Sequence, residues 1–447
     1  MLRRVHERRN ICSLTLFLSC LSATTFAQSV PASSPQKLSL TLRQAVLLAL
    51  QENPQQIIAL LQVQQSGRDS QIARAPLLPQ VDLYATGGVS QYNFQSVERL
   101  PAPKPAGPYQ TFEGGTTFSQ TLLNLPAIRR YQIGREGVQE ARANEKTSRE
   151  NVTAVVVTQY LLVLRAMANY QATSARVALA ERLYNQAVEL QKTGIGLNID
   201  VLRANVELQS ERQSLIRADT DTRTTRYRLA ELLDLPRDQE PEAADHLEFF
   251  DVPTFDRSII LDKALATRPE MKAIASEQRI AQLAQKSASE ERLPQFDFDG
   301  YWASQGQHIN DGIPAYTYAA TIRMPLFVGG RIHAEVQRDK LLGQQVDESR
   351  KQLEARIIQE VKSAADELDA ARTAVEVANL ALKLANEEVA QAQRRFQAGI
   401  TTNIEVITAQ TSLAQANDNQ IEALYNFNQS RANLARAMGE IENTYSK

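Results

Sequence analysis

The 447-residue chain has only two cysteines, Cys12 and Cys20, and both lie within its first twenty residues. This excludes a disulfide framework and a cysteine-based metal site from the rest of the chain. Excess positive charge is also missing, because 49 Lys and Arg are matched by 51 Asp and Glu. Nucleic acid is therefore not expected as a partner.

Patterns typical of enzymes are missing as well. The turn Gly194-Ile195-Gly196 begins like a dinucleotide fingerprint, but it lacks the third glycine and a preceding strand. No P-loop or nucleophile elbow occurs. Three of the four histidines, His246, His308 and His333, lie far apart and have no metal-ligand spacing around them. We expect no catalytic residue, no cofactor and no metal.

Proline is absent between Ala127 and Leu235 and after Pro325, which permits very long helices. In the second stretch, apolar residues follow the unbroken 4,3 spacing of a coiled-coil seam. The positions 205 residues earlier keep the same register, with three polar residues among them. The seam residues of the second stretch are Ile357, Val361, Ala364, Leu368, Ala371, Val375, Ala378, Leu382, Ala385, Val389, Ala392 and Phe396.

The N-terminus has the pattern of an export signal. Arginines between Arg3 and Arg9 precede an apolar stretch over 11–21, and small residues end at Ala27. We predict cleavage after Ala27, so that 1–27 is a signal peptide; lipidation at Cys20 is the alternative, although the residues before it make a poor lipobox. The apolar stretch is too short for a transmembrane helix, which needs about 20 residues. No later segment reaches that length either, so any membrane span is expected to consist of strands.

Two halves of the chain share one plan. Ala49-Leu50 with Asn53-Pro54 recurs as Ala264-Leu265 with Arg268-Pro269, and Leu78-Pro79-Gln80 recurs as Leu293-Pro294-Gln295. Such a long period indicates duplication of a whole substructure and not a solenoid. We predict a first repeat over 28–245 and a second over 246–447.

Each repeat is predicted to contain a first helix, two strands, a long helix, a tight turn and a return helix. In the strands, Val81, Leu83 and Phe298 belong to an apolar face, whereas Asp82 and Asp297 belong to the other. A proline-rich segment over 101–108 separates the first two strands and is expected to be a loop. The predicted helices are 41–75, 126–192, 198–234, 258–291, 330–397 and 402–438, and the strands are 80–94, 109–123, 295–305 and 315–327.

Four strands are too few to close a membrane barrel, because known spanning barrels start at about eight. Several chains must therefore pool their strands, and the simplest symmetric result is a tube with one end in lipid and a helical end in water. Strand aromatics are candidates for interfacial girdles, with strand-to-helix packing as the alternative. These residues are Tyr84, Tyr92, Phe94, Phe112, Phe118, Trp302, Tyr316 and Tyr318.

The chain resembles the TolC family of bacterial outer-membrane efflux proteins over essentially all of its predicted mature region. The resemblance rests on Thr41-Leu42 with Ala45, Ala49-Leu50 and Asn53-Pro54, on Leu293-Pro294, Met324-Pro325-Leu326-Phe327 and Gly329-Gly330-Arg331, and on Phe396, Gly399-Ile400 and Glu405-Val406. It implies a mainly α fold with a small β part. In a homotrimer, this fold would form a 12-stranded β-barrel in outer-membrane lipid and a 12-helix α-barrel in the periplasm.

The same resemblance implies partners and site residues. The partners would be a periplasmic adaptor protein and an inner-membrane transporter, with small molecules or proteins as cargo. The hairpin tips, with Gly194, Ile195, Gly399 and Ile400, would dock the adaptor; the alternative is that they are simple helix-hairpin loops.

A periplasmic gate would place Glu405, with its counterpart Asp200, in carboxylate rings. The alternative is that both are solvated acids near a helix N-terminus. Thr408 stands where the family has a second gate carboxylate, and Thr401 stands where it has a latch arginine, so a tight ionic latch is not expected. The alternative function is an exported periplasmic coiled-coil scaffold or adaptor without a pore.

Overall fold

The computed structural model describes residues 36–92, 106–194, 196–250, 256–398 and 400–446. The predicted signal peptide 1–27, Cys20 and Phe94 lie outside these residues, as do Ile195 and Gly399 of the predicted tips.

The described chain is mainly helical, with one four-stranded sheet and one two-stranded sheet, which confirms the predicted fold class. The helices are α1 (Leu42–Glu52), α2 (Pro54–Arg74), the 3-10 helix η1 (Ala75–Leu77), α3 (Leu125–Lys192), α4 (Asn198–Leu232), α5 (Arg257–Thr267), α6 (Pro269–Glu290), α7 (Arg331–Gln397), α8 (Asn403–Ala437) and α9 (Ile441–Ser446). The strands are β1 (Gln36–Leu40), β2 (Gln80–Tyr92), β3 (Ala106–Leu123), β4 (Gln239–Ala243), β5 (Gln295–Gly306) and β6 (Ile313–Arg323).

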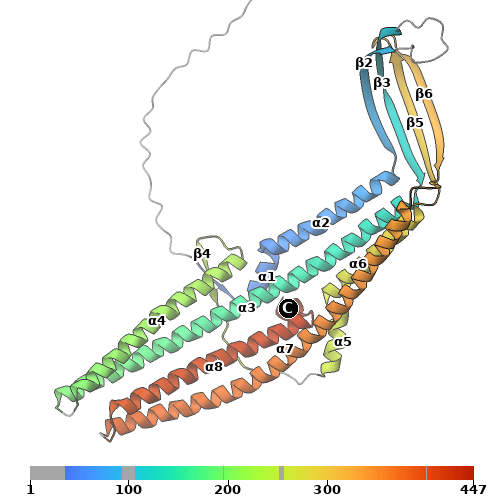
Figure 1. Cartoon of the computed structure of the whole chain (residues 1–447). Helices are drawn as coiled ribbons and strands as arrows, with labels where there is room; N and C mark the ends of the chain where they lie inside the picture. Colours follow the sequence, from blue (N-terminus) through green and yellow to red (C-terminus); the bar gives the residue numbers. More distant parts are fainter. Residues whose placement is uncertain (1–35, 93–105, 195, 251–255, 399, 447) are drawn as a thin grey trace, which may run out of the picture.

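The molecule is elongated, with the four-stranded sheet at one end and two helical hairpin tips at the other (Figure 1). Helices α3 and α7 run from the sheet to the tips, and the 68 residues of α3 correspond to about 100 Å at 1.5 Å per residue. Helices α2 and α6 accompany the half near the sheet, and α4 and α8 accompany the half near the tips. Four helices therefore form the wall along the whole helical part.

The first helix of each repeat is broken, whereas the sequence analysis predicted continuous helices over 41–75 and 258–291. Helix α1 ends before Asn53-Pro54, and α5 ends before Arg268-Pro269. A proline lacks the N–H that the helix needs and restricts the residue before it to extended backbone. Asn53 then caps α2 by accepting a hydrogen bond from the Gln55 N–H at 2.9 Å.

The four-stranded sheet is antiparallel in the order β2-β3-β5-β6, so β2 and β6 are its free edges within the protomer. The register places Val81 opposite Phe118 and Trp302 opposite Tyr316, all on one face. This face is apolar and exposed, as the 83% exposure of Leu83 shows. Its larger members are Val81, Leu83, Val89, Phe112, Phe118, Phe296, Phe298, Trp302, Tyr316, Tyr318 and Ile322.

The opposite face of the sheet is polar. Glu113 accepts hydrogen bonds from the hydroxyls of Tyr84 and Tyr301, the latter at 2.6 Å. Thr121 donates to Asp297 at 3.1 Å on the same face. The assignment of Tyr84 to an apolar girdle is therefore wrong, because its even position on the strand directs it to Glu113.

The predicted loop over 101–108 is also partly wrong. Gly107 and Pro108 lie within β3, although the ladder pairs Ser90 with Tyr109 and Tyr92 with Ala106, leaving a register shift between the pairs. A strand accommodates proline at such an irregularity, where no ladder N–H is required.

The predicted seam of α7 forms the core of the second hairpin. Eleven of its twelve residues are buried, and only Leu382 is half-buried. Near the tips, Leu183 and Ala187 of α3 join Phe396 and Val406 in one cluster that packs the two hairpins together. The two repeats are thus held side by side along their length.

Helix α3 is long and apolar enough to qualify as a membrane span, contrary to the prediction that no later segment is. Its apolar residues from Val152 to Leu164 are mostly buried against α1, α4 and β4. They form the largest core cluster of the protomer, so burial against protein explains their composition.

Short elements pack on the wall at mid-length (Figure 1). We call this group the belt; it consists of β1, α1, β4, α5 and α9. Strands β1 and β4 pair in parallel across some 200 residues of sequence. The buried Tyr160 of α3 donates a hydrogen bond to Leu40 O at 2.9 Å and contacts Asp245 Oδ2 at 2.8 Å. These contacts join the belt to the wall.

Candidate functional site

The first hairpin tip is closed by two glycines at the end of α3. Gly194 has φ +79°, a left-handed conformation that favours glycine. Gly196 donates its N–H to Leu190 O at 2.8 Å, and a Cβ at Gly196 would lie 2.9 Å from the Gln191 nitrogen. Both positions therefore require glycine for local geometry, whatever else the tip contacts.

The second hairpin tip exposes an apolar side chain. Ile400 donates its N–H to Arg395 O at 3.0 Å, which ends α7, while its side chain is 70% exposed. Leu197 of the first tip is 66% exposed. The neighbouring Ile195 and Gly399 lie outside the described residues. Each tip therefore presents an apolar residue to water.

Glu405 lies in the first turn of α8 and is held within its own tip. Thr401 donates a hydrogen bond to Glu405 Oε2 at 2.5 Å, and Arg395 Nη1 lies 3.4 Å from Oε1. The Glu405 side chain remains 37% exposed. Thr401 thus orients the carboxylate as a hydroxyl donor, and Arg395 partly offsets its charge.

Asp200, the counterpart of Glu405, is more enclosed. Its side chain is 17% exposed and lies 3.8 Å from Arg203. Its backbone carbonyl accepts a hydrogen bond from Asn403 Nδ2 at 2.9 Å, and Asn403 is fully buried. Asn403 therefore ties the two tips together, a role that the sequence analysis missed. The sequence carried one signal for this residue, because an asparagine, Asn198, stands at the matching position of the first repeat.

Thr408 lies in apolar surroundings. It lines a cavity of about 430 Å³ between α4 and α8, with Leu202, Val206, Ile404 and Ile407 among its neighbours. Val206 is 71% exposed. Arg203 and Glu207 complete the lining, so the uncharged Thr408 has one basic and one acidic neighbour beside the apolar ones.

The tip region thus combines one exposed carboxylate, apolar contact residues and a buried asparagine bridge. In the part of the chain that the structure describes, no group of three or more His, Cys, Asp or Glu residues is arranged to hold a metal ion.

Comparisons with known proteins agree with this architecture. A family model described as "Outer membrane efflux protein" matches residues 46–234 and 260–440. The chain is 24% identical to the pyoverdine export outer membrane protein OpmQ of Pseudomonas putida, over 96% of this chain and 97% of that protein. It is 20% identical to the outer membrane protein TolC of Vibrio cholerae, over 83% and 84% of the two chains.

Solved structures share the fold. The outer membrane channel CmeC of Campylobacter jejuni superposes with a TM-score of 0.79 at 18% identity, covering 90% of this chain and 86% of that one. The MtrE outer membrane channel of Neisseria gonorrhoeae, solved in its open state, gives 0.76 at 18% identity over 90% and 89% of the two chains.

Proposed function

This chain belongs to the outer membrane efflux protein family and is an outer-membrane channel, and we propose that three copies assemble into the exit duct of a tripartite export system. The duct would cross the outer membrane with a 12-stranded barrel and extend through the periplasm as a 12-helix barrel.

The observation that carries this proposal is the open, two-faced sheet. Strands β2 and β6 have unpaired edges in the protomer, and one whole face is apolar and exposed. Isolated in water, such a sheet would be prone to aggregate. Pairing of β6 with β2 of the next copy removes both edges, and lipid covers the apolar face. The four strands have 11 to 18 residues. A tilted strand needs about 9–11 residues to cross a bilayer, so each strand is long enough.

The helical wall has matching free edges. Exposed apolar residues follow α2, where Leu61 and Ile72 are 55% and 68% exposed. They also follow the half of α7 near the sheet, where Leu341 and Leu342 are 59% and 45% exposed. Helix α2 packs on α3, and α7 packs on α6 and α8, so these stripes lie at opposite edges of the wall. Copies placed around a common axis would bury one stripe against the other.

The gate and the docking surface are assigned to the tip region. We propose that Glu405, with Asp200 behind it, sets the charge of the periplasmic constriction, and that Thr401 and Thr408 leave it without a strong ionic latch. Gly194, Ile195, Gly399 and Ile400 would contact a periplasmic adaptor protein, which links the duct to an inner-membrane transporter.

The cargo is proposed only by class. The Pseudomonas putida relative is named for pyoverdine export. For this chain we propose small molecules or proteins, with selection made chiefly by the transporter.

Membrane fractionation followed by bilayer recording tests the proposal. A duct requires detergent for extraction, runs as a heat-sensitive oligomer and conducts ions. The alternative, a pore-free coiled-coil scaffold, would be extracted as a soluble periplasmic protein and would give no conductance.

A further inference from the structure

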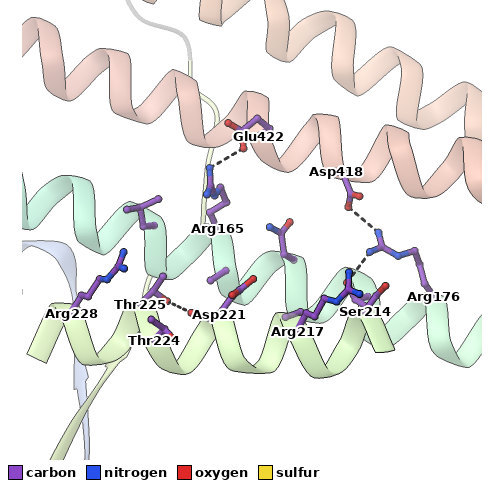
Figure 2. A pocket seen from close by; sticks show the side chains of 15 residues that line it. Arg165, Arg176, Ser214, Arg217, Asp221, Thr224, Thr225, Arg228, Asp418 and Glu422 are labelled. Atoms are coloured by element: carbon purple, nitrogen blue, oxygen red, sulfur yellow. Dashed lines mark hydrogen bonds and ion pairs between the residues drawn. The ribbon is translucent and has the colours of Figure 1, made fainter. Parts of the chain in front are cut away.

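A second, more polar groove runs between α3, α4 and α8, between the belt and the tips (Figure 2). Its volume is about 650 Å³, and four arginines line it. Arg165 and Arg176 belong to α3, and Arg217 and Arg228 belong to α4. Each pair is spaced by eleven residues, or about three helical turns, so both members point to the same side of their helix.

The two α3 arginines are already neutralised. Arg165 pairs with Glu422 at 3.0 Å, and Arg176 pairs with Asp418 at 2.9 Å, both acids being on α8. Arg176 also contacts Glu211 at 3.3 Å. The pairs of Arg165 with Glu422 and of Arg176 with Asp418 join the two repeats across the groove and are visible in Figure 2.

The two α4 arginines differ from them. Arg217 and Arg228 are exposed, and neither forms an ion pair with any residue that the structure describes. Asp221 lies between them on the same face and is likewise unpaired within the described chain. The groove therefore holds two guanidinium groups whose hydrogen-bond donors are free to bind an anion, beside a single uncompensated carboxylate.

Helical phase places this groove on the face opposite the belt. The linking segment with Asp245 and Leu247 covers a cavity lined by Leu164 and Met167 of α3 and by Leu424 of α8. The groove is lined by a different set of residues on the same helices, among them Arg165 and Asn169 of α3 and Glu422 of α8. At about 100° per residue, the two sets lie on opposite sides of each helix.

The belt must lie outside the assembled tube, because its helices and strands would otherwise fill the bore. The groove consequently faces the bore. Thr408 and Glu422 are two heptads apart, or about four helical turns, and lie on the same face of α8. The groove therefore continues the wall that leads from the proposed gate.

We propose that Arg217 and Arg228 form a binding site on the inner wall for anionic groups of the passing cargo, such as carboxylates and phosphates. This inference rests on the proposed function and extends it to a class of cargo. The planar guanidinium binds either group with two parallel hydrogen bonds. Three copies would present six such groups around the bore, beyond the negative ring at Glu405.

Block of the open channel by citrate in planar bilayers tests the site. Four proteins are compared: wild type, R217Q/R228Q, R217K/R228K and the matched control R223Q. Arg223 is another exposed α4 arginine, but it pairs with Asp219 and does not line the groove. We expect citrate to block wild type and R223Q alike, R217Q/R228Q about tenfold more weakly, and R217K/R228K to an intermediate degree.

Equal block of R217Q/R228Q and R223Q, or a wild-type channel that citrate does not block, would overturn the site while leaving the duct intact. Absence of any wild-type conductance would instead refute the proposed function. If R217Q/R228Q does not assemble, the single variants R217Q and R228Q decide, each with block about threefold weaker than R223Q if the site exists and unchanged if it does not.

Discussion

The hydroxyl of Tyr160 and the carboxylate of Asp245 lie 2.8 Å apart, joining the longest helix to the segment that links the two repeats. Burial and the neighbouring carboxylate raise the pKa of Tyr160, so its hydroxyl stays protonated. The same carboxylate accepts a hydrogen bond from the Leu42 N–H at 2.7 Å. One acid thus holds α1, α3 and the repeat linker together.

Removing this hydroxyl should weaken the belt. We expect Y160F to lower the free energy of unfolding by about 1–3 kcal/mol, because the buried site loses the one hydroxyl proton that Leu40 O and the Asp245 carboxylate share. The thermal midpoint of the helical circular dichroism signal in detergent measures the change. Y425F is the control, because the Tyr425 hydroxyl makes no hydrogen bond within the described chain. Equal midpoints for the two variants would show that the Tyr160 contacts add nothing.

The stability of the protein should fall as pH rises from about 5 to 7.5. Burial raises the pKa of Glu150 from 4.5 to about 7, despite a hydrogen bond of 3.1 Å from the Ile441 N–H, and the charges of Glu442 and Glu270 add to the effect. Arg149 does not offset it fully because it is paired with Glu442.

A raised folded-state pKa means that the folded chain binds more protons than the unfolded chain between these two values. The stabilising contribution of Glu150 is therefore complete below pH 4.5 and is lost as pH passes 7. We expect E150Q, which imitates the protonated side chain, to flatten the pH dependence by on the order of 2 kcal/mol. Thermal midpoints at pH 5.5 and 7.5 give the measurement, with the exposed E348Q as control. The same slope in E150Q and E348Q would contradict the assignment.

Neutralising Glu405 should weaken the preference of the channel for cations. Glu405 is the more exposed of the two proposed gate carboxylates, so permeating ions would approach it more closely. Reversal potentials in a KCl gradient are expected to shift toward zero for E405Q and to change less for D200N, because Asp200 is largely enclosed. Unchanged selectivity in E405Q would remove it from the gate.

A charge at the second tip should impair export without impairing assembly. Ile400 is 70% exposed, and I400D would place a solvated carboxylate on the proposed adaptor surface. We expect the amount of heat-sensitive oligomer to be unchanged and cargo resistance to be lost. I259D introduces the same charge at a similarly exposed isoleucine on the belt and should leave export intact. Normal resistance with I400D would argue against docking at this tip.

Sequence periodicity predicted the parts of this fold that depend on local regularity. The 4,3 spacing from Ile357 to Phe396 identified the buried seam, and strand alternation identified the apolar face that includes Val81 and Trp302. The pairing of β1 with β4 was missed, because five-residue strands far apart in sequence carry no periodic signal. The breaks at Asn53 and Arg268 were visible as X-Pro steps and should have ended the first helices.

The tip residues could be named from the sequence, but their surroundings could not. No pattern indicates that Thr401 bonds Glu405, because this contact depends on the local conformation of the second tip. The recurrence of Asn403 as Asn198 marks the residue but not its partner, because the contact with Asp200 depends on how the two hairpins pack. The unpaired state of Arg217 and Arg228 likewise follows from where α8 places its acids.

The sheet of the protomer has two unpaired edges, and we propose that the protomer shares this sheet with identical copies. Native mass spectrometry of the detergent-extracted particle tests this directly by counting chains. We expect three chains per particle, whereas a stable monomer that dissolves without detergent would show that the protomer closes its own sheet.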